Sequence, residues 1–124
     1  MTIRSLVVDT DTASDDAVAL VLAALDPTVE IRMVTVVAGN VPLELAVRNA
    51  ITTLDVVDKG SVPVHAGAKR PLKRPLETAQ FVHGEDGMGS ADLPLPTRGP
   101  DSEDAVEALL RVSTDEPGRH TLVT

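Results

Sequence analysis

The segment VVDTDTASDDAVAL, residues 7–20, carries four carboxylates within eight positions: Asp9, Asp11, Asp15 and Asp16. Two carboxylates held about 4 Å apart repel by about 4 kcal/mol at an effective dielectric of about 20. A cation would turn that repulsion into attraction, and oxygen ligands suit a hard divalent ion. The cluster therefore predicts a metal site formed by converging carboxylates.

The elements around this cluster determine where its carboxylates point. The apolar run 3–8 predicts a strand buried on both faces, with Asp9 and Asp11 at its carboxyl end. Residues two apart in an extended strand share a face, so both carboxylates can point the same way. In open parallel sheets, ligands bind in the crevice outside this end of the strands.

A helix start is the alternative explanation for Ser14, Asp15 and Asp16. Serine is a good N-cap, and two acidic residues in a first turn complement the helix dipole. This explanation leaves Asp9 and Asp11 unaccounted for, so the whole cluster favours the metal site.

Strand-like and helix-like segments alternate along the chain. The segment 17–25 is apolar on every side and predicts a buried helix that ends at Asp26-Pro27. Further strands are expected at residues 30–37, 61–67 and 120–124, and further helices at residues 43–58 and about 102–114. The order predicts an α/β fold: an open, mainly parallel sheet with flanking helices.

Specific residues are expected to end or begin the later helices. Gly60 stands where a C-terminal cap of the helix 43–58 belongs, and Asp101 or Ser102 is expected to cap the last helix. His65 and His120 lie at strand positions and are expected to be structural.

Residues 68–100 form a long irregular segment with five of the nine prolines and the tract HGEDGMG at 83–89. A connection of this length without periodicity is usually functional or disordered, or it indicates a wrong assignment of elements. We expect a long active-site loop. Its basic residues are expected to form a solvated face: Lys69, Arg70, Lys73 and Arg74.

Composition excludes several classes of function. The net charge of −8 argues against nucleic acids and anionic membranes as partners, and the chain has no cysteine for a thiolate zinc site. No apolar run approaches the roughly 20 residues of a membrane span, and the N-terminus lacks the features of a signal peptide. A soluble cytoplasmic protein is expected, with one aliphatic core and a single aromatic residue, Phe81.

The string DTDTASDDAVAL resembles the N-terminal signature of the inosine-uridine-preferring nucleoside hydrolases, Asp-x-Asp-Pro-Gly-x-Asp-Asp-Ala. VTVVAGN ends in Gly-Asn as the second strand of that family does, and VPVHAGAKRPL resembles its third strand and following loop. HGEDGMG resembles the tract His-Gly-x-x-Gly-x-Gly. Thr12 and Ala13 replace the Pro-Gly pair, which removes no carboxylate.

The runner-up is a haloacid-dehalogenase-type phosphatase, whose first strand also ends in Asp-x-Asp. Ala13 stands where that pattern has Thr or Val, and Asp15-Asp16 at the start of an apolar helix is foreign to it.

The nucleoside hydrolase resemblance implies a Rossmann-like fold, bound Ca²⁺, and hydrolysis of ribonucleosides to ribose and free base, within purine and pyrimidine salvage. By position, it makes Asp11 a calcium ligand and the general base, and Asp16 a second ligand. The remaining implied roles are a ribose contact for Asp15 and Asn40, a base contact for His83 and support of the loop for Asp9.

The resemblance also implies that residues 1–124 are the N-terminal portion of a single domain, truncated after about four strands. Family members commonly form dimers or tetramers. An alternative function for such a chain is that of a catalytically inactive, truncated calcium-binding remnant.

Overall fold

The computed structural model describes residues 2–124. Its strands form one parallel four-stranded sheet with the order β3-β2-β1-β4. The strands are β1 (Arg4–Thr10), β2 (Val29–Val36), β3 (Val64–Ala66) and β4 (His120–Val123). The helices are α1 (Ser14–Leu25), α2 (Leu43–Val56), α3 (Gln80–His83) and α4 (Ala105–Asp115). The predicted open parallel sheet with flanking helices is confirmed.

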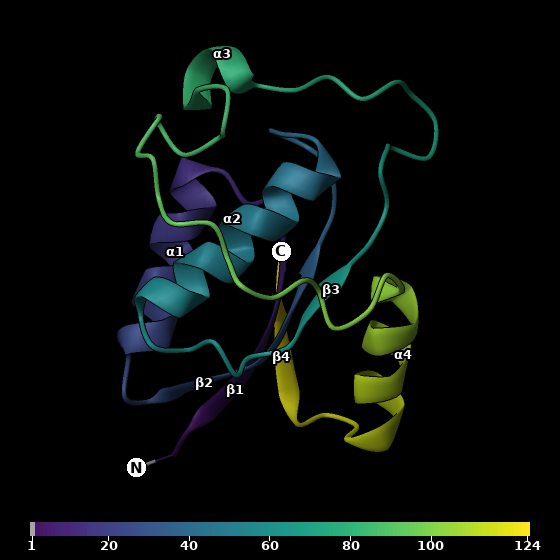
Figure 1. The fold of residues 1–124 in the computed structure, drawn as a ribbon. Coiled ribbons are helices and arrows are strands. Elements are labelled where there is room, and N and C mark those ends of the chain that lie inside the picture. The colour runs from purple at the N-terminus through teal and green to yellow at the C-terminus, as the bar shows by residue number, and fades with distance from the viewer. Residues whose placement is uncertain (1) are drawn as a thin grey trace.

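The connections between strands run in opposite directions on the two sides of β1. The chain moves from β1 through β2 to β3, then returns across the sheet to form β4 on the other side of β1. Right-handed crossovers that travel in opposite directions put their helices on opposite faces. Figure 1 shows α1 and α2 on one face and α4 on the other. The carboxyl ends of β1 and β4 therefore flank a topological switch point, where ligands bind in such sheets.

The core is aliphatic and lies mainly on the face covered by α1 and α2. Leu20, Val34, Ile51 and Leu54 are at most 1% exposed in this main cluster. A smaller cluster under α4 contains Val7, Met33 and Val112, the first two of them on adjacent strands. These two layers hold the sheet between them, which fixes the strand ends that carry the acidic residues.

Helix α1 is buried on one side only, so the prediction of a helix buried on every side is wrong. Val18, Leu22 and Leu25 are 69%, 73% and 65% exposed. The helical period turns these residues away from the sheet, whereas Ala17 and Leu20 pack toward it. The helix does end at Leu25, before Asp26-Pro27, as predicted.

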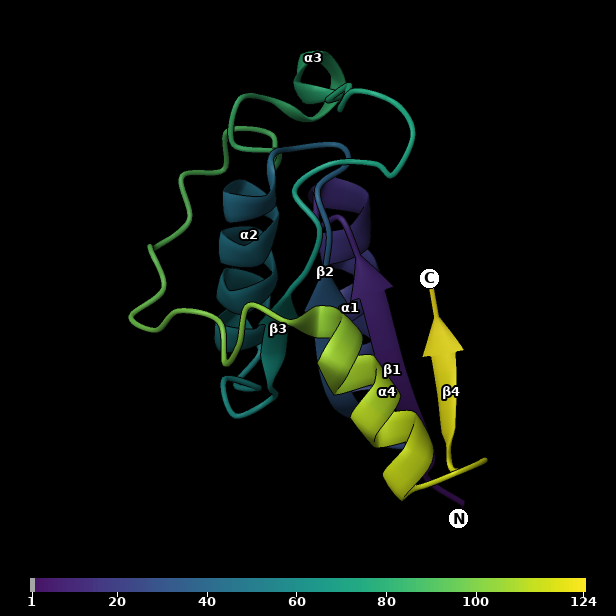
Figure 2. The same ribbon diagram turned by 90° about the vertical axis from the view of Figure 1, so that its right-hand side faces the viewer.

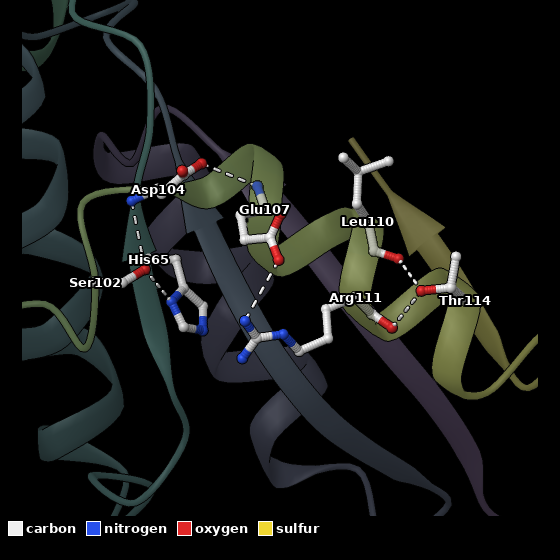
Figure 3. A network of polar contacts seen from close by, with 7 residues as sticks. All are labelled: His65, Ser102, Asp104, Glu107, Leu110, Arg111 and Thr114. Carbon is white, nitrogen blue, oxygen red and sulfur yellow. Dashed lines mark hydrogen bonds and ion pairs between the residues drawn. The ribbon is translucent and has the colours of Figure 1, made fainter.

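Two of the predicted N-caps are also wrong. Ser14 is the first residue of α1 and Ala13 is its N-cap, while the Ser14 hydroxyl lies 2.9 Å from Nδ1 of His83. Helix α4 is capped by Asp104, whose carboxylate accepts a hydrogen bond from the Glu107 N–H over 2.9 Å (Figure 3). Asp101 and Ser102 do not cap α4, because their side chains contact residues of β3.

These contacts with β3 involve two neighbouring residues. The Asp101 carboxylate accepts the N–H of Val64 over 2.9 Å, and the Ser102 hydroxyl lies 2.7 Å from Nδ1 of His65. Figure 3 shows the Ser102–His65 pair beside the start of α4. His65 thus has the structural position that the sequence predicts.

The end of α2 differs from the prediction as well. The helix ends at Val56, and Asp58 adopts the left-handed conformation with a φ of 57°. Gly60 therefore does not cap this helix, because the reversal of the chain occurs two residues earlier.

The long segment after β3 crosses the carboxyl ends of the strands. Figure 2 shows α3 beyond the end of β1, at the same end of the sheet to which the arrowhead of β4 points. The four basic residues near its start are all exposed, as predicted: Lys69, Arg70, Lys73 and Arg74. Within residues 2–124, no helix is long and apolar enough to span a membrane.

Candidate active site

Asp11 lies directly after β1, at the switch point of the sheet. Its Oδ2 accepts a hydrogen bond from the backbone N–H of Asn40 over 2.8 Å. Gly39 makes this approach possible, because a Cβ at that position would come within 2.8 Å of Cβ and Cγ of Asp11. The Gly39-Asn40 pair thus holds the Asp11 carboxylate by its backbone, and the Asn40 side-chain amide is not used in this contact.

Asp16 is the carboxylate that the turn after β1 holds most closely. Its Oδ2 accepts the Thr10 hydroxyl over 2.5 Å and the Asp11 N–H over 3.2 Å. The Thr10 hydroxyl is also 3.0 Å from the hydroxyl of Thr12, which is fully buried. Thr12 therefore contributes a polar partner to this turn, where the family signature has proline.

The electrostatics of Asp16 reflect a crowded acidic environment. Burial raises the pKa of Asp16 above its usual value of 3.8, the hydrogen bond from Thr10 lowers it, and the neighbouring Asp11 and Asp15 raise it further. Asp11 and Asp16 therefore form a pair of half-buried carboxylates whose ionised forms repel each other. A hard cation would relieve this repulsion, and carboxylate oxygens are the donors that calcium prefers.

The prediction that all four carboxylates converge is wrong. Across residues 2–124 there is no group of three or more Asp, Glu, His or Cys side chains placed to hold a metal ion. Asp9 faces β2, where its Oδ1 accepts the hydroxyl of the fully buried Thr35 over 2.6 Å. Asp15 is exposed on the first turn of α1. The strand pairing of Asp9 and the helical rotation of Asp15 thus separate these two from the pair formed by Asp11 and Asp16.

Backbone contacts bring the long loop over this pair. The carbonyl oxygen of Asn40 accepts the N–H of Ala79 over 2.8 Å, just before α3. At the end of α3, Nδ1 of His83 lies 2.9 Å from the hydroxyl of Ser14 on α1. Asn40 and His83 are therefore brought to the edge of the sheet that carries Asp11.

Asn49 is a residue of the site that the sequence analysis missed. It is 2% exposed on α2, and its Nδ2 donates to the carbonyl oxygens of Thr12 over 3.1 Å and Asp86 over 2.8 Å. Both side-chain amide protons are thus used to join the acidic turn to the loop. The sequence did hold one indication of this role: Asn49 is a polar amide that stands directly before the apolar Ala50 and Ile51 in the predicted helix.

Gly87 allows the loop to lie this close. Its φ is 77°, and a Cβ would come within 2.6 Å of Val41 Cγ1 and 3.1 Å of Asn49 Nδ2. A side chain at this position would separate the HGEDGMG tract from α2.

His120 lies at the start of β4, at the opposite end of the sheet. Its Nδ1 is 2.8 Å from the Ser5 hydroxyl and its Nε2 is 2.6 Å from a carboxylate oxygen of Glu116. These contacts fix β4 against β1 and the end of α4, which is the structural role expected from the sequence.

Comparison with known proteins identifies the class to which this fold and site belong. The model of the inosine-uridine preferring nucleoside hydrolase family matches residues 6–124, so the chain belongs to this family. The haloacid-dehalogenase alternative is thereby set aside.

Similar proteins support the same assignment. The chain is 40% identical over 118 residues to the pyrimidine-specific ribonucleoside hydrolase RihA of Klebsiella pneumoniae, covering 95% of this chain and 38% of that protein. RihA of Photobacterium profundum is 39% identical over 120 residues, with 97% and 39% of the two chains covered. The chain thus spans about two fifths of the length of these relatives.

Solved structures of nucleoside hydrolases have the same fold over this region. The plant nucleoside hydrolase PpNRh1 matches with a TM-score of 0.90 and 31% identity, covering 96% of this chain and 38% of that one. An inosine-guanosine nucleoside hydrolase matches with a TM-score of 0.80 and 34% identity, covering 97% and 37%.

Proposed function

We propose that this chain carries the N-terminal part of a nucleoside hydrolase site, which cleaves the N-glycosidic bond of ribonucleosides to give ribose and free base. The observation that carries the proposal is the pairing of Asp11 and Asp16 at the topological switch point. Membership of the family and the similarity to a pyrimidine-specific ribonucleoside hydrolase support it.

The donor set of Asp11 and Asp16 fits Ca²⁺, because both side chains are half-buried oxygen donors and the neighbouring Asp11 disfavours the ionised form of Asp16. We assign these two residues as its protein ligands in this part of the chain. Calcium, when bound, lowers the pKa of water and orients hydroxyl groups of the substrate. Asp11 is the general base that accepts the proton of the attacking water.

The other predicted residues are assigned to the substrate. Asp15 is exposed at the first turn of α1 and accepts a hydrogen bond from a ribose hydroxyl. The side-chain amide of Asn40 contacts the ribose, and His83 contacts the base. Asp9 supports the turn through its bond to Thr35.

Negative charge at this edge of the sheet suits the reaction. Cleavage of the glycosidic bond builds positive oxocarbenium character on the sugar, and nearby carboxylates stabilise that charge. Contacts to the ribose hydroxyls orient the anomeric carbon toward Asp11. The substrate is thus a small-molecule ribonucleoside, in keeping with the excess of acidic residues and with a role in purine and pyrimidine salvage in the cytoplasm.

A second candidate function is calcium binding without catalysis. It is favoured by one observation: in residues 2–124 no group of three or more Asp, Glu, His or Cys side chains is placed to hold a metal ion. A second copy of the chain in a homo-oligomer is a further source of groups for either function.

The experiment is incubation of the chain with inosine or uridine in the presence of Ca²⁺, followed by assay of the released reducing sugar and free base. Asp11-dependent release of ribose supports the hydrolase, with Asp11→Ala as the inactive variant. Calcium binding that Asp11→Ala abolishes, with no release of ribose, supports the second function. Release of ribose by Asp11→Ala contradicts the assigned role of Asp11.

A further inference from the structure

Ser14 makes an unusual contact for the first residue of a helix. Ala13, one residue earlier, occupies the N-cap position of α1. The Ser14 hydroxyl lies 2.9 Å from Nδ1 of His83, 69 positions away in the sequence. Both residues are half-buried, so the pair is partly shielded from water.

The backbone of His83 is fixed independently of this contact. Its N–H donates to the carbonyl oxygen of Ala79 over 3.0 Å, and its own carbonyl oxygen accepts the N–H of Gly89 over 2.7 Å. The next residue, Gly84, turns the chain with a φ of 87°. With the backbone held in this way, the orientation of the imidazole ring depends on rotation about the side-chain bonds.

The Ser14 hydroxyl removes that remaining freedom. A hydrogen bond at one ring nitrogen fixes the ring plane and sets the role of the other nitrogen. Because Ser14 occupies Nδ1, Nε2 is the nitrogen presented to a ligand. Ser14 also belongs to the same first turn as Asp15 and Asp16, so one helix end positions both the carboxylates and the imidazole.

We propose that Ser14 is a positioning residue that orients His83 so that Nε2 meets the base of a bound ribonucleoside. This inference rests on the proposed function, and it adds a residue to which no role in that function has been given. Its physical basis is the contact between α1 and the end of α3, which joins the part of the site that carries charge to the part that covers the base.

The test uses three variants of the whole chain: Ser14→Ala, Ser14→Thr and Ser113→Ala. Threonine keeps the hydroxyl at position 14. Ser113 is the matched control, because it is exposed on α4 and its hydroxyl donates to the Leu109 carbonyl oxygen over 2.8 Å. Long-range proton–nitrogen NMR of the imidazole rings in Ca²⁺-containing buffer reports the state of each ring nitrogen of His83.

We expect Ser14→Ala to shift the Nδ1 signal of His83, and Ser14→Thr and Ser113→Ala to leave it in place. Inosine or uridine should shift the Nε2 signal of the unmodified chain. Ser14→Ala should weaken that binding about three- to tenfold, as expected for loss of one hydrogen bond, and Ser14→Thr should restore it.

The outcomes separate this inference from the function on which it rests. An Nδ1 signal that Ser14→Ala does not shift overturns the positioning role. The positioning role is also overturned if a nucleoside shifts the Nε2 signal of His83 equally in the unmodified chain and in Ser14→Ala. That result would leave the proposed function intact. If neither nucleoside shifts any signal of the unmodified chain, the proposed function fails, and the positioning role fails with it.

Discussion

The backbone N–H of Asn40 donates a hydrogen bond to Oδ2 of Asp11 over 2.8 Å. This contact joins the segment after β2 to the segment after β1 at the switch point of the sheet. It orients one carboxylate oxygen through the main chain, so the orientation depends on how closely the two segments approach. Gly39 decides that distance.

Replacement of Gly39 by alanine should disrupt the site. The new Cβ would overlap the Asp11 carboxylate, so either the Asn40 N–H or the carboxylate must move. We expect a loss of about 1–3 kcal/mol in the free energy of unfolding and at least a tenfold loss of calcium affinity, measured by urea unfolding and calorimetry. Gly99→Ala is the control, because nothing lies within 4 Å of a Cβ at that position. Equal effects of the two substitutions would contradict the importance of the Gly39 contact.

Asn49 should contribute to stability and to the order of the loop. Asn49→Leu leaves the carbonyl oxygens of Thr12 and Asp86 without their donor. Loss of a buried hydrogen bond costs about 1–3 kcal/mol when a partner stays unsatisfied, so the free energy of unfolding should fall by about that amount. Hydrogen exchange should also become faster at Gly87 and Gly89.

Thr52→Val provides a comparison on the same helix. The Thr52 hydroxyl makes a longer bond of 3.4 Å to the Pro94 carbonyl oxygen, so its removal should cost less. If Asn49→Leu were as mild as Thr52→Val, Asn49 would not hold the loop.

The fold follows from patterns that short segments carry on their own. The apolar run before Asp9 and the β-branched segment before Gly39 predict strands, and their alternation with helices predicts a parallel sheet. The exposed side of α1 could not be predicted in this way, because Val18 and Leu22 are as apolar as its buried Leu20. Which side of a uniformly apolar helix faces the sheet is decided by packing.

Only part of the candidate site could be predicted from the sequence, because contacts between distant residues decide the rest. The spacing of the acidic residues indicates a site after β1, and the structure pairs Asp11 with Asp16. The direction of Asp9 depends on Thr35, which lies 26 positions away on β2. The contact of Ser14 depends on His83, which lies on α3. Such partners are set by the tertiary structure and carry no signal in the local sequence.

Asp16 should reduce the stability of the calcium-free chain. Its folded-state pKa is raised, chiefly by burial, so the ionised carboxylate destabilises the fold at neutral pH. The destabilisation should diminish as the pH falls through the folded-state pKa toward the unfolded value. Asp16→Asn should therefore raise the free energy of unfolding at pH 7 without calcium, while it weakens calcium binding.

Asp26→Asn, at the other end of α1, should lower the free energy of unfolding at pH 7, which is the opposite of the effect expected for Asp16→Asn. Hydrogen bonds from the hydroxyl and the N–H of Thr28 lower the pKa of Asp26, so its ionised form stabilises the fold at pH 7. A decrease in stability for Asp16→Asn equal to that for Asp26→Asn would contradict the account of the acidic pair.

The stability of the loop around Asp86 should depend on pH. Its carboxylate accepts the N–H groups of Met88 over 2.8 Å and Ser90 over 3.1 Å, and the Met88 bond is the main cause of its lowered pKa. A lowered folded-state pKa contributes stability that is present above the usual value of 3.8 and is lost as the pH falls through the folded value. The amide signals of Met88 and Ser90 should shift in NMR with a midpoint below 3.8. A midpoint at or above that value would rule out this role of the carboxylate.

The most direct test of the central claim is calorimetric titration of Ca²⁺ into the chain and into Asp11→Asn, Asp16→Asn and Asp26→Asn. We expect about one bound ion per chain, with binding lost in the first two variants and retained in Asp26→Asn. Two results would contradict the claim that Asp11 and Asp16 form the metal-holding part of a nucleoside hydrolase site. One is no binding by the unmodified chain, and the other is binding by Asp11→Asn and Asp16→Asn as tight as that of the unmodified chain.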